Sequence, residues 1–254
     1  MRINRVTFIS DNLKLKGEIY IPETGNPTYP ATCLCHGISA GPYNPHERSW
    51  PILAEKFCRA GFITMIFNFR GAGLSEGNFD ILGWAEDLKA ALKILLKTEG
   101  IDKKRLYLLG SSAGATAAIY VTAQEKQIAG LVTLGCPSTF GFVKANQGNA
   151  AIQRFRDTGI IKDSDFPPSI QVWLEHFERV TALRWIDKIA PRPILIMHGD
   201  MDDVVPIEHA HQLYKLAGEP KEMVIIPGAG HRLRLVADAV NIALNWMQKQ
   251  ATLI

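Results

Sequence analysis

Short apolar runs alternate with longer segments of helical periodicity along most of the chain. The apolar runs are rich in β-branched and aromatic residues and predict strands at 6–10, 13–21, 31–35, 62–68, 105–110, 128–134, 193–198 and 222–226. Segments with apolar residues three and four positions apart predict helices at 48–60, 83–98, 207–216 and 233–248, and a helix of small residues follows Ser112. Such an alternation is typical of a mostly parallel sheet covered by helices, so the expected fold class is α/β.

Turn residues predict how some of these elements are connected. Asp11 and Asn12 separate the first two strands, and because their side chains favour tight turns we expect an antiparallel hairpin there. Gly61 stands directly after a predicted helix, in a position where glycine commonly ends one. The sheet is therefore expected to start with an antiparallel pair.

The alternation lapses between Cys136 and Ile189, and we interpret 137–189 as an insertion over the sheet. Within it, Ser169 is a candidate N-cap for a helix with an apolar stripe that includes Trp173 and Phe177. The aromatic side chains of the insertion are expected mainly to pack together, with some of them forming the roof of a pocket. They are Phe140, Phe142, Phe155, Phe166, Trp173, Phe177 and Trp185.

Composition and charge exclude several classes of protein. A chain of 254 residues, 47% of them hydrophobic and 21% charged, can bury a substantial core, and we expect one domain over 1–254. The formal charge of +3 and the absence of long basic runs argue against nucleic acid as a partner. The N-terminus lacks the apolar core of a signal peptide, and no apolar run approaches the roughly 20 residues of a membrane helix. A cytoplasmic protein without membrane insertion is expected, whereas its oligomeric state is not predicted.

No pattern in the sequence indicates a metal or a cofactor. The four cysteines, Cys33, Cys35, Cys58 and Cys136, show neither CxxC nor Cys/His metal spacing, so we expect buried thiols. The Gly-rich segment 71–73 lacks the strand-to-helix GxGxxG context of a dinucleotide site and the lysine of a phosphate-binding loop. We therefore expect no cofactor and no metal.

One short motif carries candidate chemistry. Gly110-Ser111-Ser112-Ala113-Gly114 fits G-x-S-x-G and lies where a predicted strand gives way to a helix. A serine on such a turn is exposed by a strained backbone, and small neighbours keep the turn free of clashes. The motif therefore predicts Ser112 as a nucleophile.

A serine nucleophile needs an imidazole to take its proton and a carboxylate to orient that imidazole. Among the seven histidines, His231 is the best placed, because it follows strand 222–226 in a Gly-rich loop. The loop after strand 193–198 offers three acids, Asp200, Asp202 and Asp203, and their chemistry alone does not choose between them.

The order of nucleophile, acid and histidine along the chain resembles that of the α/β-hydrolase superfamily, and the resemblance covers essentially the whole sequence. It implies an eight-stranded, mostly parallel sheet with antiparallel first strands, helices on both faces, and a small helical cap at about 137–189. In family members the acid loop commonly has the form H-G-x-x-D-x-x-V-P, which aligns the acid with Asp202 in segment 198–206.

Two further segments resemble the same superfamily. His36-Gly37-Ile38 resembles its H-G loop, which implies the backbone amides of Ile38 and Ala113 as oxyanion-hole donors and a structural role for His36. Segment 68–75 resembles the D-x-R-G-x-G-x-S stretch of the family, with Asn68 in place of the usual aspartate.

These residues predict a carboxylesterase-type serine hydrolase (EC 3.1.1.-) that cleaves small to medium acyl or aryl esters through an acyl-enzyme on Ser112. The partner expected is a small-molecule ester, because the insertion is short and carries no long apolar lid. Thioesterase, acyltransferase and peptidase activities use the same triad and are alternatives. A ligand-binding protein that keeps the fold without catalysis would be expected to have a broken triad.

Overall fold

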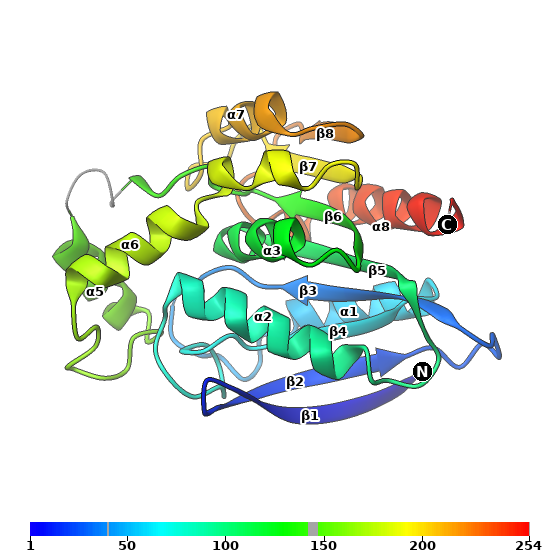
Figure 1. Cartoon of the computed structure of the whole chain (residues 1–254), viewed down its shortest axis with the longest axis horizontal. Coiled ribbons are helices and arrows are strands. Elements are labelled where there is room, and N and C mark those ends of the chain that lie inside the picture. Colours follow the sequence, from blue (N-terminus) through cyan, green and yellow to red (C-terminus); the bar gives the residue numbers. More distant parts are fainter. Residues whose placement is uncertain (40, 142–146, 254) are drawn as a thin grey trace.

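The computed structural model describes residues 1–39, 41–141 and 147–253 and contains one eight-stranded sheet (Figure 1). The strands are β1 (Arg2–Ser10), β2 (Leu13–Ile21), β3 (Tyr29–Cys35), β4 (Ile63–Phe67), β5 (Ile101–Ser111), β6 (Ile128–Leu134), β7 (Ile194–Gly199) and β8 (Lys221–Ile226). They lie in the order β1-β2-β4-β3-β5-β6-β7-β8. The pairs β1/β2 and β2/β4 are antiparallel and the remaining pairs are parallel, which confirms the predicted fold class.

The predicted hairpin forms at the start of the sheet. Ser10 pairs with Leu13, and the two residues between them, Asp11 and Asn12, have φ values of 46° and 65°. Two successive residues with positive φ turn the chain in the hand that matches the twist of the paired strands, and Asp and Asn tolerate this conformation better than most residues.

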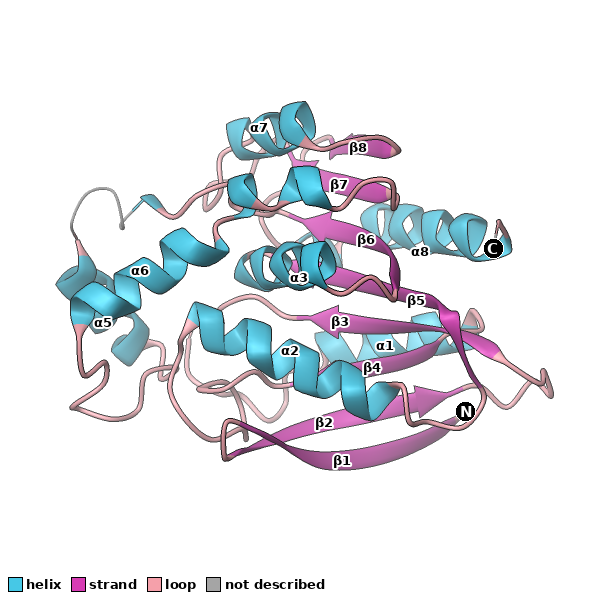
Figure 2. Cartoon of the chain, in the orientation of Figure 1, coloured by secondary structure: helices cyan, strands magenta, loops and turns pink. Residues whose placement is uncertain are grey.

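Helices cover both faces of the sheet (Figure 2). Helices α1 (Ser49–Arg59) and α8 (Ala237–Thr252) pack on one face, and α2 (Ile81–Leu95), α3 (Ala113–Gln124) and α7 (Glu208–Leu216) pack on the other. Successive side chains of a strand point to opposite faces. In β5, Leu108 therefore joins the core beneath α2 and α3, whereas Tyr107 and Leu109 join the core beneath α1 and α8.

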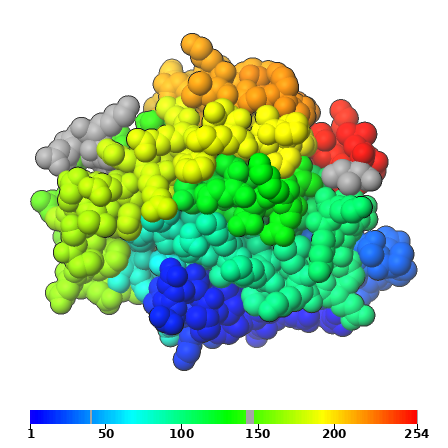
Figure 3. Space-filling model, in the orientation of Figure 1, coloured from blue at the N-terminus to red at the C-terminus, as the bar shows by residue number. Residues whose placement is uncertain are grey.

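The segment between β6 and β7 lies at the carboxyl ends of the strands (Figure 1). It contains α5 (Gly148–Asp157), α6 (Ile170–Val180) and the short 3₁₀ helices η1 (Ala182–Arg184) and η2 (Ile186–Lys188). As predicted, Ser169 caps α6, because its side chain accepts a hydrogen bond from the Val172 amide. On the face seen in Figure 3 this segment continues the surface formed by α2 and α3.

Aromatic side chains of this segment extend the core on the α2 and α3 side of the sheet. Phe155, Trp173 and Phe177 are buried and contact the ring of Phe79, which precedes α2. Phe142 lies outside the described residues. The packing role expected for these aromatics therefore holds for the three buried rings.

The last helix and α5 differ most from the sequence-based expectation. The last helix begins at Ala237 and not at 233, because 233–235 form the 3₁₀ helix η3 (Leu233–Leu235) and Val236 adopts an extended conformation. Helix α5 was not predicted, since it is polar apart from a few buried positions such as Ile152 and Phe155. No helix in the described part of the chain combines the length and the apolar character needed to cross a bilayer.

Candidate active site

Ser112 lies on the sharp turn between β5 and α3. Its backbone has φ 53° and ψ −129°, a conformation that residues other than glycine rarely adopt. The turn also brings α3 close to the loop after β3, so that a Cβ on Gly114 would overlap the carbonyl oxygen of His36. Glycine at this position of the G-x-S-x-G motif is therefore required for steric reasons. The turn presents a partly exposed Ser112 at the carboxyl edge of the sheet.

The structure brings Ser112, His231 and Asp202 together, although they come from three separate loops. His231 Nε2 lies 3.0 Å from Ser112 Oγ, and His231 Nδ1 lies 2.8 Å from Asp202 Oδ2. A carboxylate can only accept, so Nδ1 carries the proton and Nε2 is free to accept a hydrogen bond from the serine hydroxyl. This is the protonation state that a general base needs.

The geometry also separates the three candidate acids. Asp202 is only 9% exposed, and its Oδ1 accepts hydrogen bonds from the amides of Val204 at 3.0 Å and Val205 at 2.8 Å. Asp200 instead accepts a hydrogen bond from the Gly228 amide, and Asp203 is exposed. Of the three, Asp202 is the one that contacts His231.

A second histidine next to Asp202 was not predicted to take part in the site. His198, at the end of β7, is fully buried, and its Nε2 donates to the carbonyl of Val205 at 2.7 Å while lying 3.3 Å from Asp202 Oδ2. The side chain thereby braces the loop that holds the acid. Its position at the end of a buried strand, four residues before the acid, was the available signal in the sequence.

The two predicted oxyanion donors lie in segments next to Ser112. Ala113 is the first residue of α3, so its amide has no acceptor within the helix. Ile38 follows Gly37, where an added Cβ would lie 2.7 Å from the Cβ of Ser112, so the loop after β3 passes directly over the serine. Both residues line the same cleft as Ser112.

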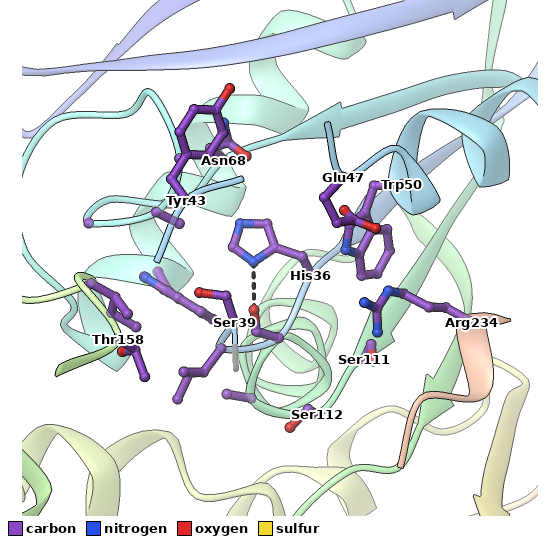
Figure 4. Close-up of a pocket in the computed structure, with 18 of the residues that line it drawn as sticks. His36, Ser39, Tyr43, Glu47, Trp50, Asn68, Ser111, Ser112, Thr158 and Arg234 are labelled. Atoms are coloured by element: carbon purple, nitrogen blue, oxygen red, sulfur yellow. Dashed lines mark hydrogen bonds between the residues drawn. The ribbon is translucent and has the colours of Figure 1, made fainter. Parts of the chain in front are cut away.

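His36 holds this loop in place. Its Nδ1 donates to the Gly37 carbonyl at 2.7 Å (Figure 4), and its Nε2 accepts from the Phe69 amide at 3.1 Å. The ring packs between Trp50, Phe69 and Trp84. Burial lowers the pKa of His36 to about 4, because the cation would lose its hydration, so the imidazole stays neutral and bridges two backbone segments.

The stretch from Asn68 to Ser75 has a structural role that the sequence did not show. Arg70 forms a buried ion pair with Asp87 of α2, with its Nη2 2.6 Å from Asp87 Oδ1, while the Arg70 amide donates to Oδ2 at 2.8 Å. Asn68 lies against Gly73, and its carbonyl accepts from the Ser75 hydroxyl at 2.6 Å. These contacts join the loop after β4 to α2. They thereby stabilise the backbone at Phe69, which His36 contacts.

Ser112 opens into a cleft of about 2650 Å³ at the carboxyl edge of the sheet. Its wall includes His231, the two predicted oxyanion donors, and Phe140 and Phe155 from the segment between β6 and β7. This cleft is larger than the roughly 300–1,000 Å³ of an ordinary small-molecule pocket. Within the described ranges, no three His, Cys, Asp or Glu side chains are grouped as metal ligands, and all four cysteines are buried and free of disulfides.

Known proteins resemble this chain in sequence and in structure. The uncharacterized protein YfhR of Escherichia coli O157:H7 is 27% identical over 224 residues, which cover 87% of this chain and 70% of YfhR. The α/β hydrolase GrgF from Penicillium sp. sh18 superposes with a TM-score of 0.77 at 18% identity, over 99% of this chain and 100% of GrgF. The esterase domain of a Rhodothermus marinus protein gives a TM-score of 0.72 at 20% identity and covers 99% of each chain.

The sequence model of the prolyl oligopeptidase family matches residues 53–253, which include Ser112, Asp202 and His231. The superposed structures share the α/β-hydrolase fold over nearly the full length. Because the family match spans far more than half of the sequence, this chain belongs to the prolyl oligopeptidase family, within the α/β-hydrolase superfamily of serine hydrolases.

Proposed function

We propose that this hydrolase cleaves carboxylic esters of small to medium size through an acyl-enzyme on Ser112. The observation that carries the proposal is the continuous hydrogen-bond chain from Ser112 Oγ through His231 to Asp202. A serine hydroxyl becomes a useful nucleophile only when a base removes its proton during attack. His231 has the tautomer and the distance for that step.

In the first half of the reaction, Ser112 Oγ attacks the ester carbonyl while its proton passes to His231 Nε2. The carbonyl oxygen becomes negative and is stabilised by the amides of Ile38 and Ala113, and a single donor of this kind contributes about 10²–10³-fold to kcat in serine hydrolases. The new imidazolium is stabilised by Asp202 and then gives its proton to the departing alcohol oxygen. The bond between Ser112 and the acyl group remains.

In the second half, water takes the place of the alcohol. His231 Nε2 removes a proton from the water as it attacks the acyl carbon, and the same two amides receive the charge on the oxygen. Collapse of the tetrahedral intermediate returns the proton from His231 to Ser112 Oγ and releases the carboxylic acid. Both halves of the reaction therefore use the same base and the same two donors.

A second candidate is amide hydrolysis, which the family match favours because the family is named for an oligopeptidase. The same residues would serve both reactions, but an amine leaving group depends more strongly on proton transfer from His231. The ester is our first choice because the alcohol departs more readily, and because the esterase domain from Rhodothermus marinus has the same fold over 99% of both chains.

A hydrolysis panel tests the proposal. The purified protein would be offered p-nitrophenyl esters of increasing acyl length, acyl-CoA thioesters, and aminoacyl p-nitroanilides, with kcat/KM measured for each and with Ser112→Ala as the control. We expect the highest kcat/KM for an ester. A higher value for the anilide or the thioester would replace the ester assignment, and no turnover of any substrate would favour a ligand-binding protein that has only kept the fold.

A further inference from the structure

One arginine close to Ser112 has hydrogen-bond donors that no described residue of the protein binds. Arg234 lies on η3, three residues after His231, and its guanidinium points into the cleft near Ser111 (Figure 4). Its Nε donates to the Ser49 hydroxyl at 3.1 Å, and the guanidinium carbon lies 5.6 Å from the centre of the Trp50 ring. Within the described residues, the two terminal nitrogens have neither a hydrogen-bond acceptor nor an ion-pair partner.

The surroundings of Arg234 make an unpaired positive charge energetically unfavourable. The side chain is half-buried, and burial lowers its pKa because the guanidinium loses hydration, with the nearby Arg232 acting in the same direction. Glu47 is the one acid that opposes this effect, but it does not form an ion pair with Arg234, and its Oε1 accepts from the Ser49 amide at 2.9 Å. An anion that enters the cleft would therefore compensate a charge that the folded chain leaves without a direct partner.

The charge of the whole cleft also favours an anionic ligand. The described residues that line it include seven Arg and Lys residues but three Asp and Glu residues. Their net positive charge therefore exceeds the +3 net charge of the entire chain. A cleft lined mainly by one sign of charge concentrates substrates of the opposite sign. The cations are Arg5, Lys16, Arg48, Arg154, Lys162, Arg232 and Arg234, and the acids are Glu18, Glu47 and Asp203.

We propose that Arg234 binds a carboxylate of the substrate, so that the natural substrate is an ester or amide that carries a free carboxylate near the bond to be cleaved. This inference rests on the proposed hydrolase function and names its substrate class. The planar guanidinium offers two parallel N–H donors, which fit the two oxygens of a carboxylate. Trp50 and Ser49 hold the plane of Arg234 in place, so little further ordering is needed when the anion binds.

The test compares matched anionic and neutral substrates. On the acyl side, p-nitrophenyl hemisuccinate, hemiglutarate and hemiadipate would be compared with p-nitrophenyl butyrate, and on the alcohol side 4-acetoxybenzoate would be compared with phenyl acetate. The ratio of kcat/KM for the anionic substrate to that for the neutral one is measured for wild type and for Arg234→Gln. We expect the substitution to lower this ratio about 10- to 100-fold for one of the two sides, as for the loss of a charged hydrogen bond.

The ratio reports selectivity for the anionic substrate alone. A variant that folds poorly, or whose chemistry is slowed, loses activity on the anionic and the neutral substrate together, so its ratio does not change. Arg232→Gln is the matched control, because it removes an exposed wall charge of the same sign two residues away but leaves the Arg234 fork intact. It therefore reports only the general effect of wall charge, which is expected to change the ratio less than about 3-fold. Arg234→Lys, which keeps the charge but not the fork, is expected to lie between wild type and Arg234→Gln.

Each outcome bears on one of the two proposals. If Arg234→Gln leaves the ratio unchanged for both sides, or if Arg232→Gln lowers it as much, the carboxylate site is wrong while the hydrolase function stands. If wild type hydrolyses neither the neutral nor the anionic esters, the proposed function itself fails. Competitive inhibition of wild type by glutarate, but not by 1,5-pentanediol, is expected as an independent check that uses no variant.

Discussion

The environment of Asp202 allows the effect of a single substitution to be worked out atom by atom. In Asp202→Asn, one carboxylate oxygen is replaced by an NH₂ group. The Oδ1 position accepts two backbone amides, from Val204 and Val205, whereas the Oδ2 position faces the ring of His231. If the NH₂ group took the Oδ1 position, it would meet two N–H donors at about hydrogen-bond distance. The amide oxygen therefore has to stay at Oδ1, and the NH₂ group has to point at His231.

This orientation forces the wrong tautomer on the histidine. The introduced NH₂ group can only donate, so His231 Nδ1 must become the acceptor and the ring proton must move to Nε2. An Nε2 that already carries a proton cannot accept the proton of Ser112, although the geometry of the triad is intact. A change of this kind is expected to lower kcat about 10⁴-fold, as in serine hydrolases with the same arrangement.

The assay is steady-state hydrolysis of p-nitrophenyl butyrate by wild type, Asp202→Asn and Asp203→Asn. Asp203 is exposed and carries the same charge one residue away, so its substitution should alter kcat less than about 3-fold. Circular dichroism would show that all three proteins are folded. Equal losses in the two variants, or a larger loss for Asp203→Asn, would refute the assignment of Asp202 as the acid.

Two further predictions concern stability. The pKa of His36 is about 4 in the folded protein and about 6.5 in the unfolded protein. The stability that the neutral, buried imidazole contributes to the fold is therefore present above pH 6.5 and is lost as the pH falls towards 4. Between pH 7 and pH 4.5 the loss is about 2–3 kcal/mol in the free energy of unfolding, measured by urea denaturation, and His36→Asn should show a shallower pH dependence than wild type. Asp87→Ala should lower the free energy of unfolding by about 3–5 kcal/mol, because it leaves the buried Arg70 without its main partner. Glu86→Ala, which breaks the more exposed pair with Lys89 on the same helix, should cost less than about 1 kcal/mol, and equal costs would contradict this account of the Arg70 contact.

Much of the fold follows from local patterns in the sequence. The strands, and the helices other than α5, were predicted mainly from apolar periodicity. The hairpin was predicted from Asp11 and Asn12, and the turn at Ser112 from its small residues between a strand and a helix. These features depend on neighbours along the chain. The start of the last helix was predicted wrongly, because the apolar Leu233 fits the helical period but lies in the separate turn η3.

The parts of the site that escaped prediction depend on contacts between distant segments. Arg70 and Asp87, His198 beside the acid loop, and Arg234 against Trp50 each acquire their role only when the chain is folded. Among the three acids, Asp202 was predicted, but only through the resemblance to the α/β-hydrolase superfamily. Their chemistry is identical, and only the fold decides which carboxylate contacts His231.

Covalent labelling shows directly whether Ser112 is the nucleophile. The protein would be treated with a fluorophosphonate probe and digested, and the modified peptide would be mapped by mass spectrometry in wild type, Ser111→Ala and Ser112→Ala. We expect a single adduct on Ser112 in wild type, the same adduct in Ser111→Ala, and no adduct in Ser112→Ala. An unlabelled wild type, or a Ser112→Ala variant that is labelled as strongly as wild type, would contradict this assignment.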